Sequence, residues 1–68
     1  MNNFKYYRDQ AKLRQVEVAE KLNLTQGAVS QWEQEESLPR AELLPEIAKL
    51  YGCTVDELLR SDTQNRPS

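Results

Sequence analysis

The chain has 68 residues, the length of one small domain, and it carries a formal net charge of −2 at pH 7. Its single cysteine, Cys53, excludes an internal disulfide, and the absence of histidine argues against a conventional zinc site. No apolar run approaches the roughly 20 residues of a membrane-spanning helix, and the first residues do not lead into the apolar segment of a secretory signal. We therefore expect a cytoplasmic protein that needs no cofactor, does not enter a membrane, and holds Cys53 as a small core residue.

The charges are unevenly distributed along the chain. Residues 1–14 contain four basic side chains and one acidic one, a net +3, whereas residues 15–68 contain five basic and ten acidic ones, a net −5. An overall negative charge is unusual for a nucleic-acid-binding protein. A basic segment at one end can nevertheless orient such a molecule on a polyanion. Ordinary solvated charges are the alternative interpretation.

A first helix is predicted over residues 4–11 because Phe4, Tyr7 and Ala11 recur at helical spacing. One of the two asparagines that precede this segment would cap it. Arg8 lies on the same, otherwise apolar face. A charge in that place requires a buried partner of opposite sign.

Two short helices are predicted next, over residues 15–22 and from residue 26 to residue 32 or 33. Asn23 follows the first of them, and asparagine tolerates the left-handed conformation that ends helices. Thr25 is a suitable N-cap for the second. The side chains expected to face the core are Val18, Ala19, Leu22, Ala28, Val29 and Trp32.

The helical pattern breaks between residues 34 and 40, where Leu38 and Pro39 mark a loop. A fourth helix is predicted over about residues 41–51. Pro45 lacks a backbone N–H, so this helix should begin late or bend there. Gly52 should end it.

A fifth helix is predicted to follow Thr54, because Thr54 and Glu57 have the spacing of a capping box. It should run to about residue 60. Residues 61–68 contain nothing to bury and are expected to form a flexible tail, so the domain itself comprises residues 1–60. The sequence as a whole predicts an all-α fold of five short helices.

The two helices joined by residues 23–25 carry the functional signal. A helix, a three-residue turn and a second helix with a polar outward face is how proteins present side chains to the major groove of DNA. Glutamine carries a donor and an acceptor and can pair bidentately with adenine. Gln15, Gln26 and Gln31 cluster where such a reader needs them, and Gly27 leaves room for a close approach. A solvated polar face is the alternative.

Residues 13–39 resemble the phage-repressor/Cro (Xre-type) helix-turn-helix family, with Ala19, Leu24, Val29-Ser30 and Glu33 at the spacings of that family. The similarity continues through residues 47–59, so that it covers about residues 4–60. The resemblance implies a lambda-repressor-like DNA-binding domain rather than an enzyme. It further implies a sequence-specific transcriptional regulator, acting as a repressor or a dual regulator, that binds a palindromic double-stranded DNA operator as a homodimer. No small-molecule substrate is expected.

The resemblance also implies roles for individual residues. In the family, the glutamine that opens the second helix contacts phosphate and steadies the first residue of the recognition helix; these positions are Gln15 and Gln26. The first, second and sixth positions of the recognition helix read bases, here Gln26, Gly27 and Gln31. The following polar residue, Gln34, contacts phosphate. The full candidate set for DNA binding is Arg14, Gln15, Thr25, Gln26, Gly27, Ser30, Gln31, Gln34 and Arg40.

Arg8 matches an arginine that in some members of the family pairs with the glutamate found here as Glu33. The chain departs from the family at Arg14, where a serine or threonine usually caps the second helix, and loses a cap worth about 1 kcal/mol. It also departs at Glu35 and Glu36, whose carboxylates lie beside the expected phosphate path and weaken backbone binding.

Dimer contacts are expected from the fourth and fifth helices, with Leu58, Leu59 and Tyr51 left over from the core. A rival hypothesis is a protein–protein interaction module, such as an antitoxin, that uses the acidic residues as its interface.

Overall fold

The structure, a computed structural model, describes residues 2–60. Over this range it contains five α-helices and one 3-10 turn, with no strand. The elements are α1 (Phe4–Gln10), α2 (Gln15–Leu22), α3 (Gln26–Glu33), η1 (Ala41–Leu43), α4 (Leu44–Tyr51) and α5 (Val55–Leu59). The all-α prediction is confirmed. The tail expected over residues 61–68 lies outside the described residues.

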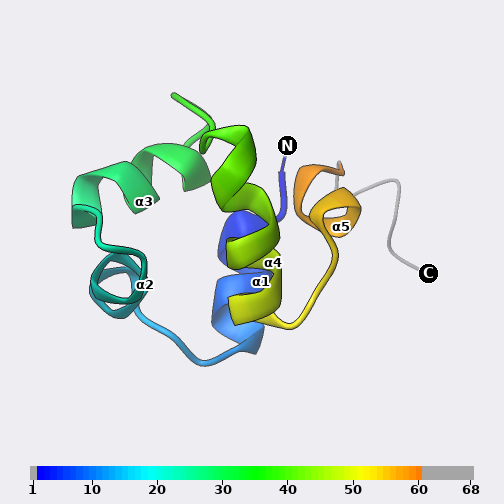
Figure 1. Ribbon diagram of the computed structural model, residues 1–68, viewed down its shortest axis with the longest axis horizontal. Coiled ribbons are helices and arrows are strands. Elements are labelled where there is room, and N and C mark those ends of the chain that lie inside the picture. Colours follow the sequence, from blue (N-terminus) through cyan, green and yellow to red (C-terminus); the bar gives the residue numbers. More distant parts are fainter. Residues whose placement is uncertain (1, 61–68) are drawn as a thin grey trace.

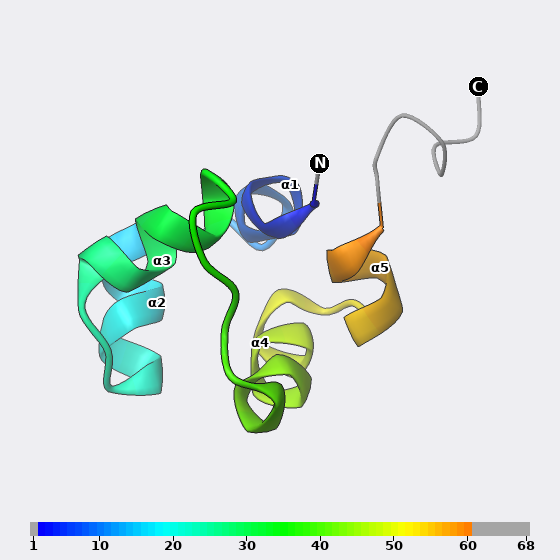
Figure 2. The same cartoon turned by 90° about the horizontal axis from the view of Figure 1, so that it is seen from above.

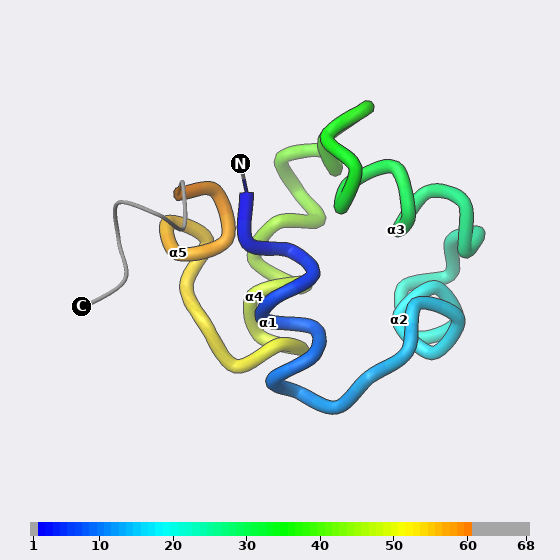
Figure 3. Tube along the Cα trace, turned by 180° about the vertical axis from the view of Figure 1, so that it is seen from behind, coloured from blue at the N-terminus to red at the C-terminus, as the bar shows by residue number. Residues whose placement is uncertain are grey.

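The helices are arranged in two groups around a central pair. Helices α1 and α4 contact each other in the middle of the molecule, with the α2–α3 pair on one side and α5 on the other (Figure 1). The view from above separates the central pair and shows the long connection from α3 to α4 crossing between the groups (Figure 2). Seen from behind, α1 lies in front of α4 between α5 and the α2–α3 pair (Figure 3). The helix-turn-helix unit therefore stands at one end of the domain.

One hydrophobic core joins all five helices. An aromatic contact within it joins α1 to α3, with the rings of Phe4 and Trp32 inclined and their centroids 5.9 Å apart. Phe4, Ile47 and Leu58 are fully buried, and burying a side chain of this size contributes about 1.5–3 kcal/mol. The complete core is Phe4, Val18, Ala19, Val29, Trp32, Ile47, Ala48, Tyr51 and Leu58.

The helix ends follow from local chemistry. Asn23 adopts the left-handed conformation, with φ 61°, and Gly52 does the same with φ 74°, so both end a helix as predicted. Thr25 caps α3 by accepting a hydrogen bond from the backbone N–H of Ala28 at 3.2 Å. Thr54 caps α5, and its backbone N–H donates to the Glu57 carboxylate at 2.9 Å, which completes the predicted capping box.

The start of the fourth helix also agrees with the prediction. Residues Ala41–Leu43 form the 3-10 turn η1, and the α-helix proper begins at Leu44. Pro45 thereby lies in the first turn of α4, where a backbone N–H would have no helical partner in any case.

Two asparagines anchor the start of α1. The Asn2 side-chain oxygen accepts a hydrogen bond from the backbone N–H of Phe4 at 3.3 Å. Asn3 occupies the N-cap position, but its side-chain amide instead donates to the carbonyl oxygen of Glu57 at 2.9 Å. The backbone N–H of Asn3 donates to the carbonyl of Leu58 at 2.9 Å. These bonds hold the first residues of the domain against α5.

The expectation of dimer contacts from Tyr51 and Leu58 is wrong. Tyr51 is 4% exposed and Leu58 is fully buried, because α1 and α4 cover the face of α5 that carries Leu58. Leu59 is 44% exposed and is the one residue of the expected three that remains on the surface.

No helix in residues 2–60 is long and apolar enough to cross a bilayer. Cys53 is half-buried against the core, and this burial raises the pKa of its thiol to about 11.

Candidate nucleic-acid interface

Helix α3 turns its apolar residues inward and its polar residues outward. Val29 is fully buried and Trp32 is 3% exposed, so this face is fixed by the core. On the opposite face Gln26, Gly27 and Gln31 are exposed. Because residues at the first, second and sixth positions of one helix share a side, the sequence places three polar or small groups on one convex surface. An α-helix with such a surface fits the major groove of B-form DNA.

The N-terminal end of this surface is held by a contact between the two helices of the motif. The Gln26 side-chain amide donates a hydrogen bond to the Gln15 side-chain oxygen at 3.3 Å. Gln15 opens α2 and is half-buried, whereas Gln26 opens α3 and is exposed. The first residue of α3 therefore has a defined neighbour, in agreement with the pairing that the family resemblance implies.

A buried ion pair between α1 and α3 lies on the core side of this contact. The guanidinium of Arg8 donates from Nε to Glu33 Oε2 at 2.5 Å and from Nη2 to Glu33 Oε1 at 3.1 Å. The two side chains are only 10% and 6% exposed. The hydrogen bond with Glu33 raises the pKa of Arg8, against an opposing effect of burial. The predicted Arg8–Glu33 pair is confirmed, and it explains an arginine on an otherwise apolar helix face.

A further hydrogen bond links the ion pair to Gln15. The Gln15 side-chain amide donates to Glu33 Oε1 at 2.9 Å. This contact was not predicted, because Gln15 and Glu33 stand 18 positions apart on different helices and neither residue implies the other. It completes a continuous chain, Arg8–Glu33–Gln15–Gln26, which we call the relay. The relay connects the core of the domain to the exposed face of α3.

The C-terminal end of α3 has its own polar contacts. The Gln34 side-chain amide donates to the hydroxyl of Ser30 at 2.8 Å. The hydroxyl of Ser37 donates to the side-chain oxygen of Gln31 at 3.4 Å. Ser37 was not among the predicted site residues. Its place in the loop after α3, six positions beyond Gln31, could have marked it as a neighbour of the exposed face.

Arginines flank the motif on either side of α3 in the sequence. The Arg14 side chain is 77% exposed, and Arg40 is exposed as well. Arg14 does not cap α2 with its side chain, as expected. Glu17 compensates in part, because its carboxylate accepts a hydrogen bond from the Arg14 backbone N–H at 2.8 Å. This bond lowers the pKa of Glu17.

The two carboxylates after α3 are not equivalent. Glu35 adopts a left-handed conformation with φ 63°, and its Oε2 accepts a hydrogen bond from the Asn2 backbone N–H at 2.8 Å. The Asn2 side-chain amide donates in turn to the carbonyl oxygen of Trp32 at 2.9 Å. Glu35 is thus engaged by the N-terminal segment, although both Glu35 and Glu36 are exposed.

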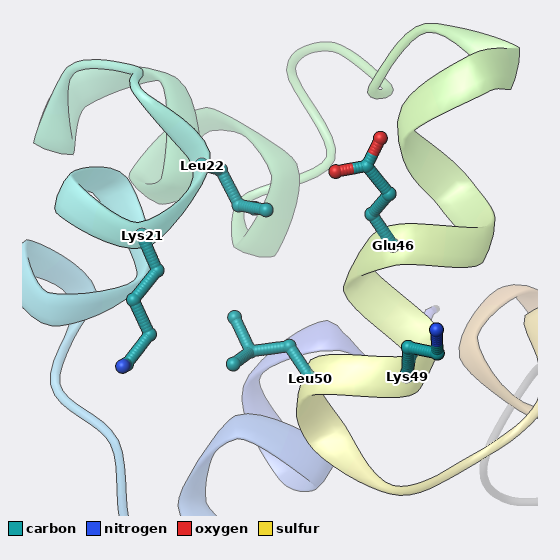
Figure 4. A pocket seen from close by; sticks show the side chains of 5 residues that line it. All are labelled: Lys21, Leu22, Glu46, Lys49 and Leu50. Atoms are coloured by element: carbon teal, nitrogen blue, oxygen red, sulfur yellow. The ribbon is translucent and has the colours of Figure 1, made fainter.

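An open hollow of about 500 Å³ lies between α2 and α4, away from the exposed face of α3 (Figure 4). Lys21 and Leu22 line it from α2, and Glu46, Lys49 and Leu50 line it from α4. None of the candidate DNA-binding residues belongs to this lining. The hollow is therefore separate from the candidate interface.

The comparison with protein families agrees with this geometry. A model of the helix-turn-helix family matches residues 4–58, which include all five α-helices except the last residue of α5. The chain belongs to the helix-turn-helix family. This assignment supports the expectation that the domain is not an enzyme.

Two curated proteins illustrate the similarity. The chain is 36% identical over 61 residues to the HTH-type transcriptional activator BcrR of Enterococcus faecalis, with 79% of this chain and 30% of that protein covered. It is 34% identical over 55 residues to repressor protein C2 of Salmonella phage P22, with 81% of this chain and 26% of that protein covered. The chain thus matches less than a third of either relative. No solved structure matches it significantly.

Proposed function

We propose that this helix-turn-helix domain binds duplex DNA with α3 in the major groove and thereby regulates transcription. The observation that carries the proposal is the exposed polar face of α3, whose first residue, Gln26, is held in place by Gln15. The similarity to one protein named as a transcriptional activator and another named as a repressor supports the same function.

Base reading is assigned to the centre of this face. Gln26 and Gln31 each offer a donor and an acceptor to base edges, and Gly27 lets a base edge or a thymine methyl approach the helix backbone. At Gly27 an added Cβ would meet only the Thr25 hydroxyl, at 3.9 Å, so the surface there is open.

Phosphate contacts are assigned to the rim of the motif. Arg14 and Arg40 are exposed cations on either side of α3, and Gln15 and Gln34 carry amide donors at the ends of the two helices. Thr25 and Ser30 complete the candidate set as hydroxyl donors. Such contacts carry no sequence information, but they supply much of the affinity and make it sensitive to salt.

The domain is further proposed to act as a homodimer on a palindromic operator. Helix α3 has eight residues, a length of about 12 Å, and so reaches only a few base pairs. Two copies related by a two-fold axis would read two half-sites about 34 Å apart, or a multiple of that spacing. The exposed Leu59 is the candidate dimer contact, since α5, the helix that carries it, lies on the opposite side of the central helices from α3 (Figure 1).

The test is selection of bound duplexes from a random-sequence pool, followed by anisotropy titrations of the selected duplex at two salt concentrations. Enrichment of a short palindrome, with affinity falling steeply as salt rises, is the expected result. Failure to enrich any sequence, with the protein shown to be folded, would contradict the proposal. The exposed acidic residues would then favour the rival function of a protein–protein interaction module.

A further inference from the structure

The donor and acceptor roles along the relay follow from the chemistry of its members. Arg8 carries only hydrogen-bond donors, so both oxygens of Glu33 face donors and accept from it. Glu33 Oε1 lies 2.9 Å from the side-chain nitrogen of Gln15. A carboxylate that already pairs with a guanidinium can only accept, and Gln15 must therefore turn its NH₂ group toward Glu33.

The orientation of the Gln15 amide determines the orientation of the Gln26 amide. With its nitrogen committed to Glu33, Gln15 presents its side-chain oxygen to the neighbouring helix, and that oxygen can only accept. Gln26 accordingly donates from Nε2, at 3.3 Å. Its side-chain carbonyl oxygen, and the second hydrogen on Nε2, remain available on the exposed face of α3.

We propose that Glu33 is a positioning residue for base recognition, which through Gln15 fixes the amide of Gln26 with its carbonyl oxygen available to the groove. This inference rests on the proposed DNA-binding function. The base that faces Gln26 then carries an amino group on its major-groove edge. Adenine satisfies both free groups, because its N6 amine donates to the carbonyl and its N7 accepts the second hydrogen; cytosine satisfies the carbonyl alone. Guanine and thymine have no donor for that oxygen at O6, N7 or O4 and can accept only the second hydrogen, so each of them, like cytosine, satisfies one of the two free groups and adenine is favoured over all three.

A glutamine without such a neighbour could rotate its amide by 180° and present either its oxygen or its nitrogen to the same base atom. The buried part of the relay removes that freedom. Glu33 is held by two bonds from Arg8, and Arg8 is itself held by the carbonyl of Leu13 at 2.8 Å from Nη1. The polarity of the exposed residue is therefore set from the core, at a distance of two side chains from the DNA.

The experiment compares selections from a random duplex pool for four proteins. The wild-type chain gives the half-site, and Gln26→Ala identifies the position that Gln26 reads, because preference is lost there. At that position the wild-type selection should favour adenine by on the order of tenfold over the other three bases on the same strand. A wild-type preference for any base other than adenine there would overturn the proposal.

Two variants remove the constraint on the orientation of the Gln26 side-chain amide. The double variant Arg8→Met, Glu33→Gln leaves an amide that can donate or accept toward Gln15, without an unpaired buried charge. Gln15→Met keeps the ion pair and removes the link. Both should lose most of the roughly tenfold preference at the Gln26 position and keep the preferences elsewhere in the half-site.

Ile47→Val is the matched control, since it lowers stability in the core without touching the relay. It should keep every base preference, which separates polarity from simple destabilisation. Unchanged preference at the Gln26 position in Gln15→Met would overturn the role of the relay even if the double variant fails to fold. A wild-type selection without any enriched sequence would overturn the proposed function and this inference with it, whereas enrichment with unaltered preferences in the variants overturns this inference alone.

Discussion

The Arg8–Glu33 pair should be the most sensitive polar feature of the fold. Removing one partner leaves the other charge in a site where the side chains are only 10% and 6% exposed. Breaking a buried pair in this way costs about 3–5 kcal/mol. A 68-residue domain has a free energy of unfolding of roughly 3–10 kcal/mol, so Arg8→Met or Glu33→Ala consumes a large share of it. The corresponding fall in melting temperature is at least about 12 °C.

The double variant Arg8→Met, Glu33→Leu should behave differently from either single change. With both charges gone, apolar side chains of similar volume fill the site, and the cost should fall to within about 1 kcal/mol of wild type or reverse in sign. Urea denaturation followed by circular dichroism at 222 nm, over the full double-mutant cycle, measures each step. If Glu33→Ala costs less than about 1 kcal/mol, the pair is screened by solvent and the reasoning is refuted.

The remaining predictions use neighbouring or matched positions. Gly27→Ala should stabilise α3 by about 0.5–1 kcal/mol, whereas Gly52→Ala should destabilise the domain by about 1–2 kcal/mol because φ is 74° at Gly52. Urea denaturation of both variants measures these changes, and equal effects would contradict the assigned backbone conformations. Leu58→Ala, in the core, should cost about 2–5 kcal/mol, while Leu59→Ala should leave the unfolding free energy of the monomer nearly unchanged and weaken only self-association, as sedimentation would show. The Cys53 thiol, with its pKa raised to about 11 by burial, should react with iodoacetamide at pH 8.5 more slowly than in urea. Equal reactivity in the folded and the urea-unfolded protein would refute the raised pKa of Cys53. Because the pKa of the folded state exceeds the unfolded value near 9, the stability that the neutral thiol contributes is complete below about pH 9 and is lost as the pH rises through about 11.

The helix boundaries could be predicted from sequence because single residues determine them. Thr25 offers a side-chain oxygen to the first turn of α3, and Asn23 and Gly52 tolerate left-handed backbone. These effects act within three or four residues. Local chemistry alone therefore locates the motif and its turn.

The packing of the fifth helix could not be predicted in the same way. Leu58 and Leu59 are adjacent, so they point about 100° apart on a helix of 3.6 residues per turn. One of them must face outward, but the choice depends on where α1 and α4 stand, which the pattern of α5 does not contain. The structure buries Leu58 and exposes Leu59.

The candidate site shows the same division. Arg8 could be recognised as needing a partner because a charge interrupted an apolar face, and the family resemblance supplied Glu33. The bond from Gln15 to Glu33 joins two polar residues that each look ordinary in sequence. It arises only when α2 and α3 are packed against α1, and it is this bond that gives the relay its direction.

The central claim is that the exposed face of α3 reads base edges, and Gln31 tests it most directly. Affinities of the wild-type protein and Gln31→Ala should be measured by anisotropy against the selected duplex and all its single-base-pair variants, with Gln10→Ala, exposed on α1, as the control. The account predicts that Gln31→Ala loses about 1–3 kcal/mol of discrimination at one position of each half-site and keeps it at the others. Equal weakening on every duplex, or no change at all, would contradict the assignment of α3 as the recognition helix.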